Sequence, residues 1–203
     1  EDIFQSVGVP LVKNALAGYN TSILSYGQSG SGKTYTMWGH PSAMFEEPSP
    51  KSHKGIVPRI FQMLFSELER EQHVSDGKQF NYQCRCSFLE MKDGSKNALY
   101  IENLTEEYVT SYDDVTQILI KGLSSRKVGA TSLNSKSSRS HIIFTFVIES
   151  WCKGISSNGF SSSKSSRISL IDLAGQDRNK VEDAGKQCLK EDKNVKKSLS
   201  QLG

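Results

Sequence analysis

Apolar positions recur along the chain at spacings that predict alternating helices and strands. Between Ile3 and Leu16 they follow a helical period, and Pro10 is expected to break or kink this helix or to begin its second half. Gly18 is expected to end it. The short apolar run 21–26 lies between turn residues and predicts a buried strand. A Gly/Ser-rich segment then leads to a helix predicted to begin near Lys33.

Two more helices and a half-buried strand are predicted in the middle of the chain. Pro58 suits the first turn of a helix whose apolar stripe runs from Ile60 to Leu68. Every second residue from Phe80 to Phe88 is apolar or a cysteine, which is typical of a strand with one buried face. Ser111 and Asp114 form a capping-box-like helix start, with Asp in place of the usual Glu.

Two buried strands are predicted in the last part of the chain. The run 142–148 is apolar on both faces and predicts a central strand, and 168–173 predicts another buried strand. The Ser/Gly-rich stretch 151–167 predicts a flexible connection with no fold of its own. The polar loop 40–55 is long for a compact domain and is expected to be functional or mobile. This alternation predicts an α/β domain with helices on both faces of the sheet.

Length and charge limit the function classes. The chain has 203 residues, enough for one domain or at most two small ones. Its net charge of +3 is too small a bias to indicate nucleic-acid binding. No stretch approaches the roughly 18 consecutive apolar residues of a membrane helix. The sequence opens at Glu1 without a methionine and stops at Gly203 after a helical run, so we expect a fragment truncated at both ends.

Four cysteines leave two interpretations open. Cys84 and Cys86 share one face of a predicted strand, whereas Cys152 and Cys188 lie apart from them. The pair could begin a metal site, but no second Cys or His pair has a matching spacing. The interpretation as small buried residues in a reducing compartment is favoured over a metal site or a disulfide.

Residues 27–34 carry the clearest chemical motif. Gly27-Gln-Ser-Gly-Ser-Gly-Lys33-Thr34 fits the P-loop pattern G-x-x-x-x-G-K-[ST] in full, between a predicted strand and a predicted helix. Its glycines let successive backbone N–H groups turn toward a phosphate, and Lys33 would reach the β- and γ-phosphates while Thr34 holds Mg²⁺. The alternative is a chance Gly/Ser-rich turn, which the strand–loop–helix context disfavours.

Two later segments complete a nucleotide site. Asp172 ends a buried strand, where P-loop proteins place an acidic residue for the Mg²⁺ water shell, and Gly175 could bring a backbone N–H to the γ-phosphate. Residues 134–141, Asn-Ser-Lys-Ser-Ser-Arg-Ser-His, are either an ordinary polar loop or a loop that closes on phosphate and orients water.

These three segments, in this order, resemble the kinesin motor family. The P-loop, residues 134–141 and residues 172–178 look like that family's P-loop, switch I and switch II, and 195–203 resembles its stretch after switch II. Myosins share the P-loop and the Ser-Ser-Arg core, but His141 and the Leu-Ala-Gly tripeptide favour kinesin. The segments 129–132 and Trp38-Gly39 resemble plant kinesins of the phragmoplast-associated group.

The resemblance implies a role for each site residue. Mg²⁺ would be held by Thr34, Ser138 and Asp172, directly or through water. Ser137 would position the attacking water and Gly175 would sense the γ-phosphate. An ion pair between Arg139 and Asp177 would close the site. The nucleotide-binding residues implied are Gly27, Gln28, Ser29, Gly30, Ser31, Gly32, Lys33, Thr34 and, beside the adenine, Tyr35.

The resemblance also implies a fold and an activity. The fold expected is a truncated, kinesin-motor-like P-loop NTPase, a three-layer αβα arrangement around a mostly parallel or mixed sheet, with 1–203 forming one partial motor domain. The activity expected is Mg-ATP binding and hydrolysis coupled to movement on microtubules, in the cytoplasm on the cytoskeleton. The partner expected is the microtubule (tubulin), with no nucleic acid and no membrane, and any oligomer is expected to form through regions outside this chain.

The sequence departs from the family pattern in places that keep a second function open. The family usually has Ser-Glu-Arg after Leu-Ala-Gly, where this chain has Gln176-Asp177-Arg178. The family's longer segment after Glu90 is shortened here, so a sheet edge could be missing. These departures motivate the alternative of a kinesin-derived nucleotide-binding module without effective turnover. A P-loop switch unrelated to microtubules is a third, less favoured alternative. The 203-residue piece alone is expected to be weakly active or inactive.

Overall fold

The described residues form four α-helices, one π-helical turn and five strands. The computed structural model describes residues 2–40, 54–74, 79–93, 99–128, 140–153 and 161–175. The helical elements are a π-helical turn Phe4–Gly8, α1 Val9–Leu16, α2 Lys33–Trp38, α3 Ile56–Val74 and α4 Tyr112–Val128. The strands are β1 Thr21–Ser25, β2 Gln79–Asp93, β3 Leu99–Val109, β4 Ser140–Lys153 and β5 Ser161–Asp172.

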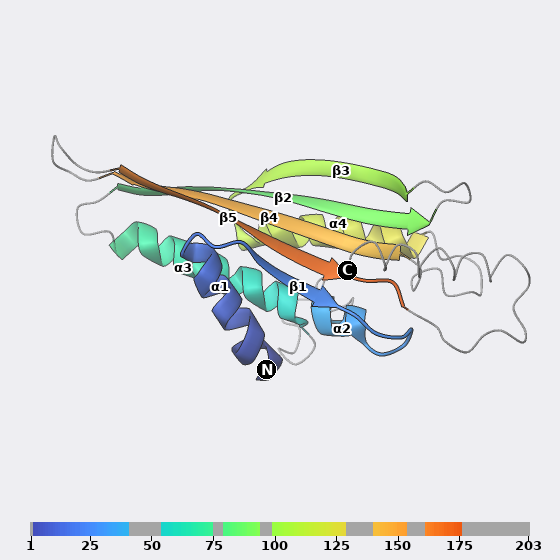
Figure 1. Ribbon diagram of the computed structural model, residues 1–203. Helices are drawn as coiled ribbons and strands as arrows, with labels where there is room; N and C mark the ends of the chain where they lie inside the picture. The colour runs from blue at the N-terminus through green and yellow to red at the C-terminus, as the bar shows by residue number, and fades with distance from the viewer. Residues whose placement is uncertain are drawn as a thin grey trace, which may run out of the picture.

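The strands form one mixed sheet in the order β1-β5-β4-β2-β3 (Figure 1). β1 and β5 are parallel, and Ser25, the last residue of β1, lies opposite Asp172, the last residue of β5. β4 runs antiparallel to β5, so its beginning lies beside the end of β5, with Ile142 opposite Asp172. The end of β1, the beginning of β4 and the end of β5 therefore meet at one end of the sheet. The P-loop, His141 and the described residues 172–175 all adjoin this end.

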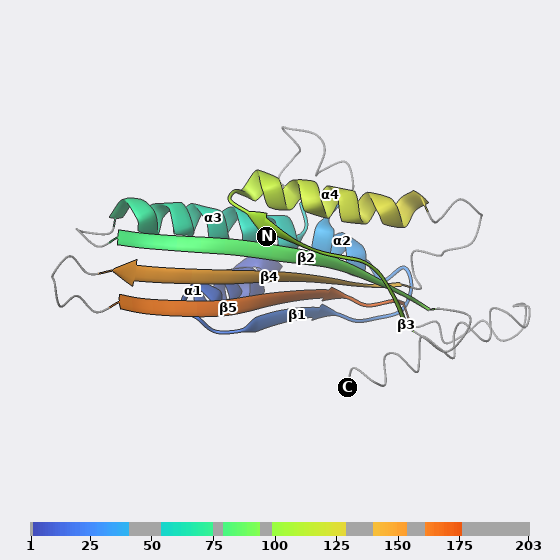
Figure 2. The ribbon, with the colours of Figure 1, turned by 90° about the horizontal axis from the view of Figure 1, so that it is seen from above.

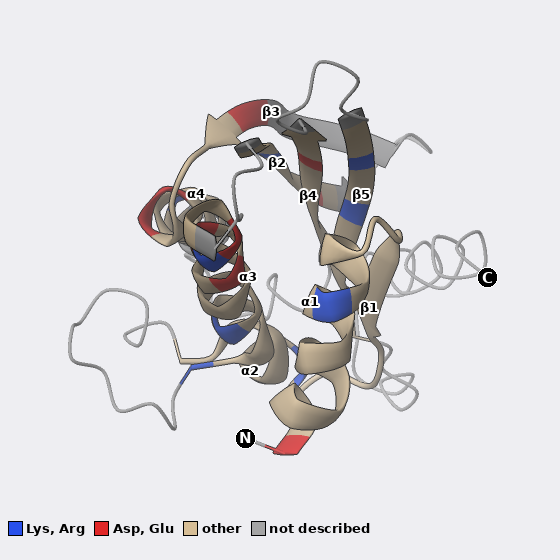
Figure 3. Cartoon of the chain, turned by 90° about the vertical axis from the view of Figure 1, so that its left-hand side faces the viewer, with Lys and Arg blue, Asp and Glu red and all other residues tan. Residues whose placement is uncertain are grey.

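The described helices pack on one face of the sheet. Figures 2 and 3 show α3 and α4 lying side by side along that face, and α1 packs against α3, β1 and β5. Phe61 of α3 is fully buried between sheet residues, with its ring centroid 5.5 Å from that of Phe144 and 4.8 Å from that of Phe146. The apolar stripe expected on this helix is confirmed, because it is buried along its length: Ile60, Phe61, Leu64, Phe65 and Leu68.

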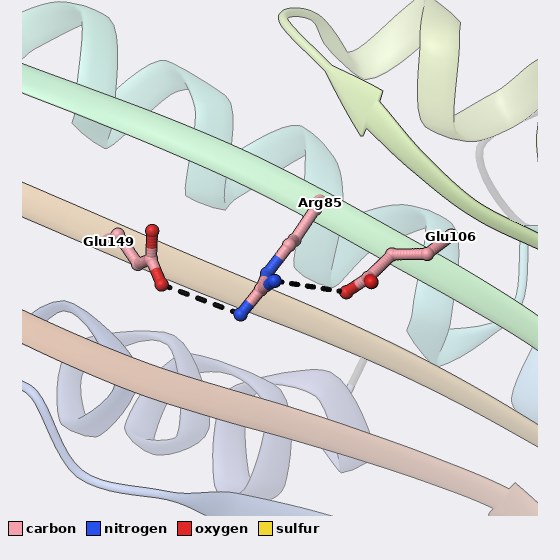
Figure 4. Close-up of polar contacts among 3 residues, drawn as sticks. All are labelled: Arg85, Glu106 and Glu149. Atoms are coloured by element: carbon pink, nitrogen blue, oxygen red, sulfur yellow. Dashed lines mark hydrogen bonds and ion pairs between the residues drawn. The ribbon is translucent and has the colours of Figure 1, made fainter.

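The opposite face of the sheet carries no helix among the described residues. There Arg85 of β2 lies between two carboxylates, 3.3 Å from Glu106 of β3 and 3.5 Å from Glu149 of β4 (Figure 4). These ion pairs are partly exposed, so each is worth at most about 1 kcal/mol. They link three neighbouring strands on a face that the sequence analysis expected helices to cover. The mixed sheet with helices agrees with the fold class, but the second helical layer is not part of the described chain.

Several local predictions are confirmed. The first helical stretch changes character where Pro10 was expected to act: a π-helical turn ends at Gly8, and Pro10 lies in the first turn of α1. Gly18 follows α1 with φ +100° and its N–H donates to the Ala15 carbonyl, which ends the helix. α2 begins at Lys33, as expected.

One segment was predicted wrongly as a flexible connection. Residues 151–167 are not without structure: β4 continues to Lys153, and β5 begins at Ser161 and pairs with it residue for residue. Backbone hydrogen bonds to the long partner strand hold this serine-rich stretch in the sheet, because the ladder needs no particular side chain. Only 154–160, between the two strands, lie outside the described residues.

A second prediction, that 21–26 form a buried strand, is wrong in its burial. β1 is present but lies at the edge of the described sheet, and Leu24 is 54% exposed. A short apolar run has the same composition in an edge strand as in a central one, so the pattern could not place it. The other edge of the described sheet is β3, which pairs antiparallel with β2. This pairing extends to Asp93 opposite Leu99, so it includes residues next to the shortened segment that follows Glu90.

The capping box at the start of α4 is confirmed, and Thr110 adds two further hydrogen bonds to the same Asp114 carboxylate. The Asp114 N–H donates to Ser111 Oγ at 3.2 Å, and the Ser111 N–H donates to Asp114 Oδ2 at 3.0 Å. The same carboxylate oxygen accepts from the backbone N–H of Thr110 at 2.8 Å and from its hydroxyl at 2.9 Å. These hydrogen bonds lower the pKa of Asp114 below its ordinary value of 3.8, and the largest contribution comes from the backbone N–H of Thr110.

Asp114→Ala is expected to lower the free energy of unfolding by about 1 kcal/mol at neutral pH, because α4 loses its cap. Since the folded-state pKa is lowered, the stabilisation is present above the ordinary value and is lost as the pH falls through the lowered one. Urea unfolding at pH 7 and pH 3 should therefore show the difference from the parent shrinking in acid. Asp113→Ala is the matched control, since it removes a carboxylate from the same turn but leaves the cap. A difference that does not depend on pH would contradict the assignment.

Candidate nucleotide site

The P-loop, residues 27–34, turns sharply between the end of β1 and the start of α2. Gly30 and Gly32 have φ values of +78° and +85°, the left-handed region that a side chain disfavours. Gly32 is the residue from which α2 starts. The spacing of the motif thus matches the backbone shape that the loop adopts, with the two glycines where the chain must curl.

Asp172 is the centre of the site. Its side chain is 0% exposed, and a carboxylate so buried requires hydrogen bonds to remain stable. Ser25 Oγ donates to Oδ1 at 2.8 Å, Thr34 Oγ1 donates to Oδ2 at 2.7 Å, and Trp38 Nε1 donates to Oδ2 at 3.3 Å. The carboxylate therefore joins the end of β1, the last P-loop residue and the end of α2.

Lys33 lies within the loop that it is expected to serve. Its Nζ donates to the backbone carbonyl of Gln28 at 2.9 Å. The ammonium group is thus held over the turn formed by the loop itself. Tyr35, the third residue of α2, is 53% exposed and its side chain is open to solvent.

Gly175 packs directly against the P-loop. A Cβ built on Gly175 would lie 2.2 Å from Ser29 Oγ and 2.8 Å from both the Cα and the N of Ser29, so a side chain does not fit there. Ser29 Oγ is buried and makes no hydrogen bond within the described structure. The chain after β5 and the P-loop are therefore in contact at a point that holds a polar atom with unused bonding capacity.

His141 connects the beginning of β4 to the same region. It is 4% exposed, and its Nδ1 accepts a hydrogen bond from the Ala174 N–H at 3.1 Å. The Leu173 N–H in turn donates to the Ser25 carbonyl at 3.2 Å. The backbone N–H groups of residues 173 and 174 thus bind the Ser25 carbonyl at the end of β1 and the His141 side chain on β4.

The residues present fit a hard divalent cation with few protein ligands. Thr34 Oγ1 and Asp172 Oδ2 are oxygen donors 2.7 Å apart, of the kind that Mg²⁺ prefers alongside water and phosphate oxygens. No group of three or more His, Cys, Asp or Glu in the described part of the chain could hold a metal by itself. A cation here would therefore depend on the nucleotide for its remaining ligands.

Two of the four cysteines, Cys84 and Cys86, are buried as expected. Cys84 and Cys86 are free thiols on the buried face of β2, at 1% and 2% exposure. Burial raises the pKa of each thiol to about 12, so both are protonated and unreactive at neutral pH. Cys152 is also a free thiol, and Cys188 lies outside the described residues.

The structure brings together part of the site expected from the sequence. Thr34 and Asp172 are in contact, and Gly175 touches Ser29. The four remaining catalytic candidates lie outside the described residues: Ser137, Ser138, Arg139 and Asp177.

None of the described helices combines the length and apolar character that a membrane-spanning helix requires.

Two residues of the site were missed by sequence reasoning. Ser25 lies at the end of a strand that read as simply apolar, and no pattern marks it. The spacing of Trp38 does indicate a place in the site, because it lies four residues after Thr34 and the two side chains therefore share one face of α2. A buried tryptophan N–H usually finds a hydrogen-bond partner, which in this position is the nearest carboxylate.

Comparison with known proteins identifies relatives along the whole chain. The kinesin motor domain family model matches residues 1–95 and 89–203, two stretches that meet at the shortened segment after Glu90. Kinesin-like protein KIN-12F of Arabidopsis thaliana is 59% identical over 221 residues, covering 100% of this chain and 20% of that protein. Kinesin-like protein KIN-12B of Oryza sativa subsp. japonica is 46% identical over 222 residues, again covering 100% of this chain and 20% of its own length. The chain thus spans about a fifth of these plant relatives.

Solved structures agree with the fold. A fast kinesin, described for its ATPase mechanism and interactions with microtubules, is 30% identical with a TM-score of 0.72, covering 96% of this chain and 55% of its own. A KIF14 dimer with AMP-PNP, in complex with a microtubule, is 30% identical with a TM-score of 0.74, covering 98% and 58% respectively. The P-loop is joined to Asp172, the family model matches along the chain, and the relatives and solved structures agree with both. The chain therefore belongs to the kinesin motor domain family.

Proposed function

We propose that this chain is the nucleotide-binding part of a microtubule motor, in which Mg-ATP binding and hydrolysis are coupled to microtubule binding and movement. The observation that carries the proposal is the hydrogen bond from Thr34 to the buried Asp172, which joins the P-loop to the end of β5. Two oxygen donors held together beside a phosphate-binding loop are the protein's part of a Mg-nucleotide site. The proposal places the protein in the cytoplasm, on the microtubule cytoskeleton.

Each of the expected site residues has a part in this function. Residues 27–34 surround the phosphates, and Lys33 leaves or shares its Gln28 contact to pair with the β- and γ-phosphates. Tyr35 offers its exposed ring to the adenine. Thr34, Ser138 and Asp172 hold Mg²⁺, directly or through water, and the bound cation supplies charge stabilisation to the phosphoryl group.

The catalytic part is arranged around the γ-phosphate. Gly175 presents its backbone N–H there, and its contact with Ser29 explains why no larger residue fits. Ser137 positions the attacking water, and an Arg139–Asp177 pair closes the site. Catalysis then comes mainly from positioning and from preorganised charge. Loss of the γ-phosphate releases the segments that contact it, which is how nucleotide state would reach the microtubule-binding surface.

A second candidate function is a nucleotide-binding module without effective turnover. Asp177 in place of Glu and the split of the family match at 89–95 favour it. The two candidates differ in one measurable quantity, the rate of phosphate release with and without microtubules. The first predicts stimulation by microtubules; the second predicts binding of ATP with a release rate that microtubules leave unchanged.

The test of the proposed function uses the full-length protein that contains this chain. Phosphate release is measured with and without microtubules, and binding of a fluorescent ATP analogue is measured in parallel. Lys33→Ala should abolish nucleotide binding, because the described P-loop supplies no other cation to the phosphates. Lys13→Ala, at the end of α1, removes an equal charge away from the loop and should bind as the parent does. Binding by Lys33→Ala at the parent's affinity would refute the P-loop assignment.

A further prediction concerns closure of the site by Asp177. Its side chain is one methylene shorter than the family's Glu, so the pair with Arg139 is expected to be looser, and a misplacement of about 1 Å can reduce a rate on the order of 100-fold. Asp177→Glu in the full-length motor should therefore raise the hydrolysis rate. Asp177→Asn, which removes the charge, should lower it. An unchanged or lower rate in Asp177→Glu would mean that the backbone already compensates for the shorter side chain.

The contact between Gly175 and Ser29 gives a prediction of its own. Gly175→Ala must push the chain after β5 away from the P-loop, since its Cβ would meet Ser29 at 2.2 Å. Because Gly175 is assigned to the γ-phosphate, ATP hydrolysis should fall on the order of 100-fold. ADP affinity should change much less. ATP hydrolysis is measured by phosphate release and ADP affinity by titration. A fall in ADP affinity as large as the fall in the ATP hydrolysis rate would contradict the assignment of Gly175 to the γ-phosphate.

A further inference from the structure

Trp38 contacts the carboxylate that lies at the centre of the site. Its side chain is 1% exposed, and its Nε1 donates to Asp172 Oδ2 at 3.3 Å. The same oxygen accepts from Thr34 Oγ1 at 2.7 Å, and Thr34 precedes Trp38 by one helical turn. Both donors thus reach Oδ2 from one face of α2.

The donors around Asp172 differ in what else they can bind. The hydroxyls of Ser25 and Thr34 donate and also accept, so each can rotate toward a cation or a water. The indole N–H of Trp38 only donates and cannot ligate a metal. When Thr34 turns to a cation, Trp38 is the donor from α2 that stays with the carboxylate.

The backbone at Trp38 is held by its neighbours in the fold. The Gly39 N–H donates to the Tyr35 carbonyl at 2.8 Å, and Gly39 forms a bridge with Lys54, where the chain returns from the long polar loop. A Cβ on Gly55 would lie 2.4 Å from Gly39 N and 2.5 Å from the Trp38 carbonyl carbon, so the returning chain lies against the backbone of Trp38. The returning chain therefore packs against the backbone from which the Trp38 side chain extends.

We propose that Trp38 is a positioning residue, which holds the Asp172 carboxylate in the orientation needed for a nucleotide-bound Mg²⁺. This inference rests on the proposed function. Partners behind a metal-binding group orient it, and their removal typically reduces metal affinity about 10- to 100-fold. The competing explanation is that Trp38 only fills the core. The two differ in whether loss of the N–H acts on nucleotide binding through Mg²⁺.

The test measures affinity for a fluorescent ATP analogue in Mg²⁺ and in EDTA, using the full-length protein. Trp38→Phe keeps an aromatic ring but removes the N–H. It should weaken binding in Mg²⁺ about 10- to 100-fold and leave binding in EDTA within about threefold of the parent. Trp151→Phe, on β4 and 43% exposed, is the matched control and should change neither affinity.

Equal losses in Mg²⁺ and EDTA, or no loss, would overturn the positioning role. If Trp38→Phe does not fold, an isostere with sulfur in place of the indole N–H, 3-benzothienylalanine, preserves the shape of the ring. The same selective loss in Mg²⁺ is then expected, and its absence overturns the inference. Failure of the proposed function has a different signature, because the parent itself would then bind no nucleotide in Mg²⁺.

Discussion

A buried carboxylate at the end of β5 is the constraint on which the site depends. Asp172 is fully enclosed, and a carboxyl group in that position requires hydrogen-bonding partners. A buried polar group left without a partner costs about 1–3 kcal/mol. The positions of Ser25, Thr34 and Trp38 are therefore set by one requirement, even though they come from three different parts of the chain.

The topology of the sheet explains why those parts meet. Parallel pairing of β1 and β5 places the P-loop and Asp172 at one end, and antiparallel pairing of β4 places His141 at the same end. No residue in the motifs specifies this pairing by itself. It follows from the face that β1, β4 and β5 bury under α1 and α3, because a shift of one residue in register would expose Phe144 and Leu170.

The sequence predicted features whose causes are local and left open those decided by distant partners. The stripe on α3, the cap formed by Ser111 and Asp114, and the start of α2 at Lys33 are each written in a few neighbouring residues. The serine-rich half of β5 is different, since its strand structure comes from pairing with β4. Ser25 and Trp38 were missed for the same reason, because their partner Asp172 is remote in sequence and its contact appears only in the folded chain.

The shortness of α2 links the stability of the site to its chemistry. An isolated helix of six residues is not stable in water, so α2 must be held by the groups that it contacts. Those groups are the core, through Met37 and Trp38, and Asp172, through Thr34 and Trp38. The helix that follows the P-loop and the end of β5 consequently stabilise each other through one carboxylate. Under the proposed function, a ligand that draws Thr34 away from Asp172 would act on both elements together, and this shared contact would be a direct physical route from the P-loop to the end of β5.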